Sequence, residues 1–73
     1  MNGDESAQQT HGENVLARET LPVERKQFTL EFRENRRGRF LRIDESAAGR
    51  RNTIIVPESG IEQFIETIRR VTV

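Results

Sequence analysis

The sequence predicts an α+β fold in which a four-stranded antiparallel sheet is followed by one C-terminal helix. Two observations support this prediction. Between residues 25 and 56, runs of residues alternate apolar and polar side chains with a period of two, which is typical of half-buried strands. Residues 59–70 instead carry apolar side chains at helical spacing. The predicted order of elements is therefore ββββα.

The two clearest predicted strands flank a short loop that contains Gly38. In residues 25–33, Phe28, Leu30 and Phe32 fall on one face, and the polar residues between them fall on the other. A glycine can adopt the positive φ that short hairpin loops require. We therefore expect these two strands to form a β-hairpin with one apolar face.

The outgoing strand of this hairpin, about residues 39–45, carries the first functional prediction. Leu41 and Ile43 alternate along it with Phe40 and Arg42. Because neighbouring strand residues point to opposite faces, Phe40 should lie on the polar face among arginines. Two alternatives remain, a shift of the strand near the loop and a place for this ring in a dimer interface.

The outer strands are predicted with less regular patterns. Residues 14–23 favour an edge strand, because Pro22 has no N–H to donate and is tolerated only at an edge or an end of a sheet. A short helix is the alternative there. After an expected loop at residues 46–49, residues 51–56 end in a β-branched run that Pro57 stops.

The C-terminal helix has a predicted start and a predicted buried face. Ser59 and Glu62 have the spacing of a capping box. The apolar stripe that follows, at positions i, i+3, i+4 and i+7, consists of Ile61, Phe64, Ile65 and Ile68. We expect this stripe to cover the apolar face of the hairpin strands, with a partner helix as the alternative occupant.

Residues 1–13 are predicted to form a disordered acidic and polar tail, and residues 14–73 a single small folded domain. The tail has almost no apolar side chains, so it cannot bury enough surface to offset its ordering entropy. His11, the only histidine of the chain, lies in this tail and is expected to bind no metal.

The length of 73 residues and the absence of cysteine predict a homodimer. A domain of this size buries only about 60% of its unfolded surface and is marginal alone. Neither a disulfide nor a thiolate metal site can reinforce it. The sequence shows no apolar run near 18 residues and no signal-peptide pattern. We therefore expect a cytoplasmic protein with no membrane partner, and association with the nucleoid is compatible with this expectation.

The formal net charge of zero conceals a segregation of charge. Residues 25–51 hold nine basic and four acidic side chains, whereas residues 1–24 hold one basic and five acidic ones. Eleven of the twelve basic residues are arginine, which suits bidentate phosphate contacts and stacking on bases. Such asymmetry favours a polyanionic partner.

The sequence predicts no enzyme, no cofactor and no small-molecule substrate. It contains no cysteine, no histidine outside the predicted tail, and no nucleophile-elbow or phosphate-loop pattern. Asp44 and Glu45 are adjacent, so they would point to opposite faces of a strand and are expected to flank a turn rather than to share acid–base chemistry.

The hairpin instead predicts a surface for single-stranded nucleic acid. Arginines can bind phosphates, an asparagine can read a base edge, and an exposed aromatic ring can stack on splayed bases that a duplex would hide. The residues that offer these groups at the hairpin are Arg33, Asn35, Arg36, Arg37, Arg39, Phe40 and Arg42.

The stretch from Glu34 to Ile43, Glu-Asn-Arg-Arg-Gly-Arg-Phe-Leu-Arg-Ile, resembles the signature hairpin of the PUR repeat of the Pur-alpha family of purine-rich element-binding proteins. The likeness extends over about residues 15–71, including the ββββα order. It implies binding of single-stranded DNA and RNA with a preference for G-rich purine sequences, in a domain formed by two repeats. A single repeat would then require a homodimer.

The resemblance also implies roles for particular residues. Asn35 and Arg37 would contact bases, and Phe40 would wedge into the base stack. Arg33, which closes the preceding strand, and Lys26, at that strand's start, would also contact nucleic acid. The sequence departs from the family near Glu24, where the family has a neutral contact residue.

Two other functions compete with this interpretation. A protein–protein interaction module could use the arginine hairpin to dock an acidic partner. A binder of double-stranded DNA could lay the sheet on a duplex. Loss of single-strand affinity on replacement of Phe40, without loss of fold, would distinguish the stacking surface from the first of these.

Overall fold

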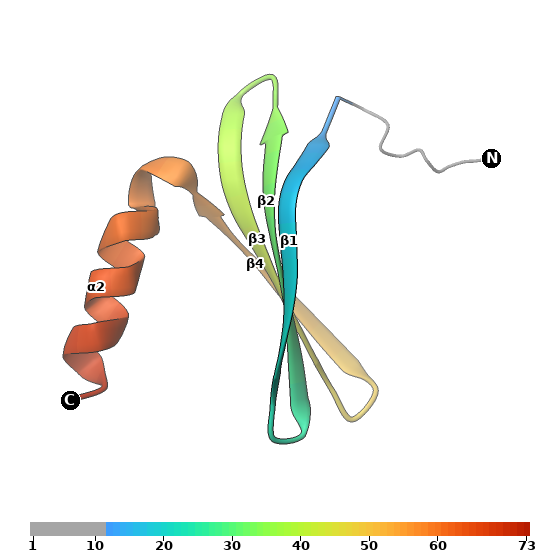
Figure 1. Cartoon of the computed structure of the whole chain (residues 1–73), viewed down its shortest axis with the longest axis vertical. Helices are drawn as coiled ribbons and strands as arrows, with labels where there is room; N and C mark the ends of the chain where they lie inside the picture. The colour runs from blue at the N-terminus through green and yellow to red at the C-terminus, as the bar shows by residue number, and fades with distance from the viewer. Residues whose placement is uncertain (1–11) are drawn as a thin grey trace.

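The computed structural model describes residues 12–73 and shows a four-stranded sheet followed by a helix (Figure 1). Most of the predicted tail, residues 1–11, lies outside the described residues. The elements are β1 (Asn14–Val23), β2 (Lys26–Asn35), β3 (Gly38–Ala47), β4 (Arg50–Pro57), the 3-10 turn η1 (Glu58–Gly60) and α2 (Ile61–Val71). The predicted ββββα order is confirmed.

The sheet is an antiparallel meander in which each strand pairs with its neighbour in sequence. Two-residue turns connect the strands, so each strand returns directly beside the previous one. Gly38, which begins β3, has φ +138°, a conformation that favours glycine because it has no Cβ. Ala48 and Gly49, between β3 and β4, both have positive φ, as the tightest hairpin turns require.

The register of β2 with β3 separates the sheet into an apolar and a polar face. Leu30 lies opposite Ile43, and these residues belong to the apolar face. Phe40 lies opposite Arg33, and Arg42 opposite Glu31, on the other face. The prediction that Phe40 joins the arginines on the polar face is therefore confirmed.

Strand β1 confirms the predicted edge strand, and the helical alternative is wrong. It pairs only with β2, and Pro22 lies opposite Gln27 near its end. A proline is tolerated there because no further strand needs its N–H. The register shifts by one residue between Val15 and Ala17, so Leu16 forms a β-bulge.

Two sequence expectations about the end of β3 are wrong. Asp44 and Glu45 do not flank a turn, since both lie within β3, paired with Thr53 and Asn52 of β4. The expected loop at residues 46–49 shrinks to two turn residues, because β3 continues to Ala47. A tight turn with positive φ closes the hairpin and leaves the neighbouring residues free to pair.

The helix does not cover the sheet of its own chain, which corrects the packing predicted for its apolar stripe. Figure 1 shows α2 running beside the strands and diverging from them. Phe64 and Ile65 are each 40% exposed and Ile68 is 47% exposed. Strand β4 passes directly into η1, so the chain has no loop that could fold the helix back onto the sheet.

The predicted capping box is also absent from the helix start. The N-cap residue of α2 is Gly60, and no side chain caps the helix. The 3-10 turn precedes the helix instead, and the N–H of Ile61 donates to the carbonyl oxygen of Glu58. The tighter turn shifts the α-helical start beyond Ser59, the residue from which the capping box was predicted.

Residues 12–73 consequently form almost no core within one chain. Val56, 8% exposed, is the only buried hydrophobic residue among those described. The radius of gyration is 14.2 Å, whereas a compact chain of this length would have about 11 Å. The apolar sheet face and the apolar helix stripe are therefore both left without a cover in one chain. In residues 12–73, no helix has the length and apolarity needed to cross a bilayer.

Candidate nucleic-acid interface

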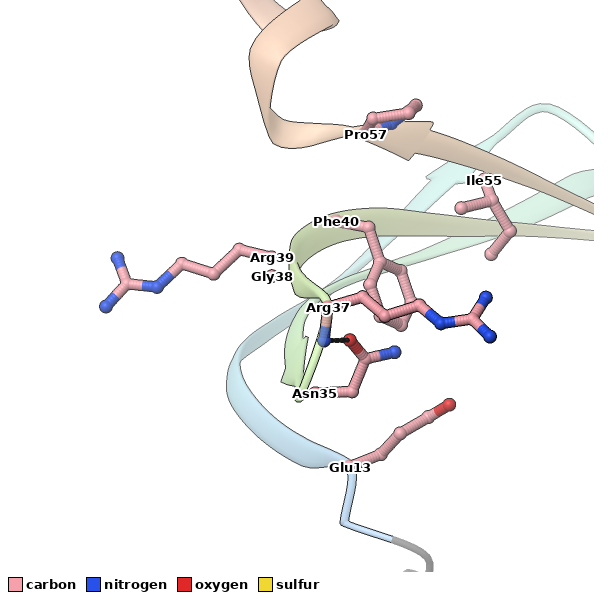
Figure 2. A pocket seen from close by; sticks show the side chains of 8 residues that line it. All are labelled: Glu13, Asn35, Arg37, Gly38, Arg39, Phe40, Ile55 and Pro57. Carbon is pink, nitrogen blue, oxygen red and sulfur yellow. Dashed lines mark hydrogen bonds between the residues drawn. The ribbon is translucent and has the colours of Figure 1, made fainter.

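The turn between β2 and β3 is stabilised by the side chain of Asn35. Its Oδ1 accepts a hydrogen bond of 2.8 Å from the backbone N–H of Arg37, as Figure 2 shows. Asparagine commonly stabilises turns by bonding the backbone two residues on. This hydrogen bond holds the amide of Asn35 beside the hairpin turn and leaves its NH₂ group facing outward.

A pocket of about 510 Å³ lies beside this turn on the polar face. It brings together three residues that the sequence predicted as one site, Asn35, Arg37 and Phe40 (Figure 2). Its full lining consists of Glu13, Asn35, Arg37, Gly38, Arg39, Phe40, Ile55 and Pro57. The sequence analysis missed Glu13, Ile55 and Pro57, which come from segments distant in the chain.

Phe40 forms the aromatic part of this pocket. It pairs with Arg33 on one side and with Pro57 on the other, and it remains partly exposed. Ile55, 53% exposed, adds an aliphatic surface on β4. The strand register places these apolar groups next to the hairpin arginines. Surfaces for single-stranded nucleic acid commonly combine a ring that stacks on a base with cations that bind the phosphates.

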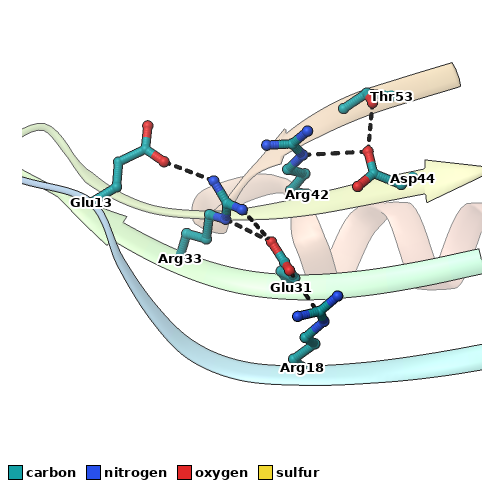
Figure 3. Close-up of polar contacts among 7 residues, drawn as sticks. All are labelled: Glu13, Arg18, Glu31, Arg33, Arg42, Asp44 and Thr53. Atoms are coloured by element: carbon teal, nitrogen blue, oxygen red, sulfur yellow. Dashed lines mark hydrogen bonds and ion pairs between the residues drawn. The ribbon is translucent and has the colours of Figure 1, made fainter. Parts of the chain in front are cut away.

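Arg33 is held by two carboxylates rather than left free (Figure 3). Its Nε donates to Glu31 Oε1 at 2.8 Å, and its Nη1 donates to Glu13 Oε1 at 2.9 Å. Burial disfavours the charged guanidinium, but the hydrogen bonds and charges of Glu31 and Glu13 outweigh that cost and raise the pKa of Arg33. Its side chain is only 21% exposed.

Glu31 is the buried anion that organises this part of the face. It is 7% exposed, and its second oxygen lies 3.3 Å from the Nε of Arg18. A buried carboxylate is tolerated only when it is paired. Here Arg33 pairs with it from the same strand, and the contact with Arg18 joins β1 to β2. The sequence pattern placed Glu31 on the polar face but could not show that two arginines enclose it.

Arg42 lies on the polar face as predicted, next to Asp44 two residues on. Its Nε donates to Asp44 Oδ1 at 3.3 Å, and the hydroxyl of Thr53 donates to the same oxygen. The hydrogen bond from Thr53, together with the nearby charge of Arg42, holds the pKa of Asp44 below its ordinary value against the opposing effect of burial.

Lys26 is separated from the other predicted site residues within one chain. It begins β2, so it lies at the opposite end of the sheet from the turn after Asn35. It also belongs to the apolar face, where its Nζ lies 2.8 Å from Glu45 Oε2. This hydrogen bond, with one from Asn52, lowers the pKa of Glu45.

The remaining two hairpin arginines are exposed and point in other directions. Arg36 lies in the turn itself, and Arg39 lies opposite Glu34, on the apolar side of the register. Figure 2 shows the guanidinium of Arg39 directed away from Asn35 and Phe40. Arg39 therefore contributes to the wall of the pocket while its guanidinium extends the positive charge around the tip, as does the exposed Arg36.

The interface combines outward amide and guanidinium donors with an aromatic ring, on a sheet face that carries further arginines. This combination is typical of small sheet domains that bind nucleic acid. The chain matches the profile of the family described as PurA ssDNA and RNA-binding protein over residues 1–72. The protein therefore belongs to the PurA family, a family of nucleic-acid-binding proteins rather than of enzymes.

The chain is also similar to a curated protein, the Transcription factor Pur-alpha 1 of Arabidopsis thaliana. The two are 49% identical over 51 residues, which are 70% of this chain and 17% of the plant protein. The chain thus spans less than a fifth of the length of this relative. No solved structure matches the chain.

Proposed function

We propose that this protein binds purine-rich single strands of DNA or RNA at the β2–β3 hairpin, with Phe40 as an aromatic wedge between bases. The observation that carries the proposal is the shared pocket of Asn35, Arg37 and Phe40. A base that leaves the stack of its strand can enter a pocket of about 510 Å³ and stack on the ring. A duplex keeps its base faces covered, so a single strand fits this surface better.

The purine preference is supported by the donor pattern at the pocket. Because the Oδ1 of Asn35 accepts the turn hydrogen bond, the group that this side chain presents outward is its NH₂ donor. The guanidinium of Arg37 is a donor only. Guanine offers two adjacent acceptors, O6 and N7, whereas adenine offers an acceptor beside a donor. A pocket with two donors therefore favours guanine.

We further propose that the binding unit is a homodimer in which each protomer helps to cover the other's apolar surfaces. Phe64, Ile65 and Ile68 of α2 are exposed in one chain, and the apolar face of its sheet has no helix over it. A second copy supplies a matching helix stripe and a matching sheet face. Burial of apolar surface contributes roughly 25 cal/mol per Å², so covering these exposed surfaces in a dimer would stabilise the protein.

The test of the proposed function is a set of fluorescence-anisotropy titrations with a purine-rich single strand, its pyrimidine complement and the annealed duplex, each at two salt concentrations. We expect tight binding to the purine strand, weak binding to the duplex and a modest salt dependence. Equal binding to all three that collapses as salt rises would overturn the proposal in favour of a generic polyanion surface. Absence of binding at low salt would favour a module that docks an acidic protein.

A further inference from the structure

One acidic side chain, Glu13, lies inside the surface that is proposed to bind a negatively charged strand. It precedes β1 and lines the hairpin pocket, where its neighbours include Asn35, Arg37 and Phe40 (Figure 2). Its Oε1 accepts a hydrogen bond of 2.9 Å from the Nη1 of Arg33. A carboxylate in this place opposes the binding of phosphate groups, so its position needs a structural explanation.

The β-bulge at Leu16 determines the face on which Glu13 lies. Ala17, after the bulge, belongs to the apolar face of the sheet, whereas Val15, before the bulge, lies opposite Arg33 on the polar face. Since side chains alternate along a strand, Glu13 falls on the same face as Val15. In a strand without the bulge, Glu13 would share the apolar face with Ala17. The bulge therefore directs this carboxylate toward Arg33, and bulges commonly reorient side chains beside functional sites.

The two carboxylates that hold Arg33 differ in how easily they can leave it. Figure 3 shows them on different sides of the guanidinium. Glu31 is 7% exposed and also pairs with Arg18, so its separation from Arg33 would leave a buried charge with one partner fewer. The side chain of Glu13 is 39% exposed, and Arg33 is its only ion-pair partner among the described residues. A part-exposed pair is weak, so Glu13 is the exchangeable partner.

We propose that Glu13 is an intramolecular competitor that occupies the place of a strand phosphate on Arg33 and weakens single-strand binding until it is displaced. The proposal rests on the proposed function, because the strand at the hairpin is the ligand with which Glu13 competes. Carboxylate and phosphate oxygens accept the same charge-assisted hydrogen bonds from a guanidinium. Displacement of Glu13 frees the Nη1 of Arg33, while Glu31 still holds its Nε. The guanidinium thus stays oriented when the strand arrives.

Two variants of the full chain remove the carboxylate from the polar face in different ways. Glu13→Gln removes the charge and keeps the size of the side chain. The double variant Glu13→Asn with Asn14→Glu exchanges two neighbours, so composition and net charge stay those of the wild type. Asn14 lies opposite Glu34, on the other face from Arg33, and the exchange therefore moves the carboxylate away from the pocket.

The measurement is a fluorescence-anisotropy titration of a labelled purine-rich single strand at one salt concentration, with circular dichroism to confirm the fold of each variant. Both variants should bind the strand about two- to five-fold more tightly than the wild type, the range expected for loss of a part-exposed ion pair. If Glu13→Gln binds more tightly but the exchange variant binds like the wild type, overall acidity rather than the position of Glu13 is responsible, and the proposal is overturned.

A second background separates competition for Arg33 from direct repulsion of the strand by Glu13. Arg33→Lys keeps a positive charge for the buried Glu31, but a single ammonium group lacks the planar fork that holds two carboxylates at once. In this background, Glu13→Gln should leave the affinity unchanged. A gain as large as in the wild-type background would show that Glu13 acts by repulsion, which would overturn the competition.

The remaining outcomes separate the competitor from the proposed function. If the wild type binds the purine strand and neither variant binds it more tightly, the competitor is excluded and the proposed function stands. If the wild type binds no strand but Glu13→Gln does, the competitor is supported and holds the site closed. If no single strand binds the wild type or Glu13→Gln, both proposals fail.

Discussion

The Oδ1 of Asn35 accepts the backbone N–H of Arg37 at 2.8 Å, so one side chain both shapes the turn and presents a donor beside it. The two tasks use different atoms of the same amide. Oxygen stabilises the hairpin, and the NH₂ group faces the pocket that also contains Arg37 and Phe40. Substitutions that change only one of these atoms can therefore separate folding from recognition.

Asn35→Asp should preserve the fold and weaken binding. An aspartate keeps an oxygen that can accept the Arg37 N–H, but it removes the donor and adds a negative charge near the strand. We expect a thermal midpoint close to that of the wild type and a loss of purine-strand affinity of at least ten-fold, since a base acceptor left without its donor costs about 1–3 kcal/mol. Asn35→Ala should lose both the turn hydrogen bond and the outward donor. Its thermal midpoint, measured by circular dichroism, and its affinity for the purine strand, measured by fluorescence anisotropy, should therefore both fall. An unchanged affinity of Asn35→Asp would exclude the amide from base contact.

Phe40→Ala should reduce single-strand affinity by about 1–3 kcal/mol, because stacking of a base on an aromatic ring contributes that much. The matched control is Phe40→Tyr, which keeps an aromatic face and should bind nearly as well as the wild type. Far-ultraviolet circular dichroism must show an intact sheet in both variants. If the alanine and tyrosine variants bind equally, the ring is a packing residue and not a wedge.

Glu13→Gln should increase the affinity for single strands by about two- to five-fold. The carboxylate of Glu13 bonds Arg33 at 2.9 Å and lines the hairpin pocket, so it competes with phosphate groups for the same guanidinium. Glu19→Gln removes the same charge from the opposite face of β1 and is the control. An equal gain in both variants, measured by anisotropy at one salt concentration, would indicate a general charge effect.

Ile68→Glu should disrupt the dimer and lower the stability sharply, because it introduces a charge into the exposed apolar stripe of α2. The wild-type protein should sediment as a dimer, with a thermal midpoint that rises with protein concentration. Gln63→Glu, on the polar side of the same helix, should change neither property. A wild-type protein that sediments as a stable monomer at all concentrations would contradict the dimer.

Acid should destabilise the protein through Asp44. Its pKa is lowered in the folded state by Thr53 and Arg42, so the folded state binds fewer protons than the unfolded state. The stabilisation is fully present above about pH 4, the ordinary range of an unfolded aspartate, and is lost as the pH falls through the lowered value. Asp44→Asn should be less stable near pH 7 and show a flatter loss of stability on acidification, as urea denaturation at several pH values would reveal. If the free energy of unfolding falls with pH in parallel for the wild type and for Asp44→Asn, Asp44 does not contribute to the acid sensitivity.

The sequence by itself determined the order of elements, the two faces of the sheet and the side of Phe40. These features depend on local periodicity, which the chain encodes residue by residue. Alternation in residues 25–45 predicts the faces of the hairpin and the side of Phe40, and helical spacing in residues 59–70 predicts the helix. The sequence also placed Asn35, Arg37 and Phe40 at one hairpin, and all three line the pocket beside its turn.

Only the tertiary structure decided which side chains meet across strands and where the helix lies. The enclosure of Glu31 by Arg18 and Arg33, and the contact of Glu13 with Arg33, depend on register and on the bulge in β1, which no local pattern specifies. Lys26 shares a strand with Asn35 but lies at the far end on the other face. The apolar stripe of α2 was expected to pack on the sheet of its own chain, but the structure leaves Phe64, Ile65 and Ile68 exposed, because periodicity alone does not state what a stripe packs against. Hydrophobic burial has no direction, so the chain connection, here the direct passage from β4 into η1, sets where the helix lies.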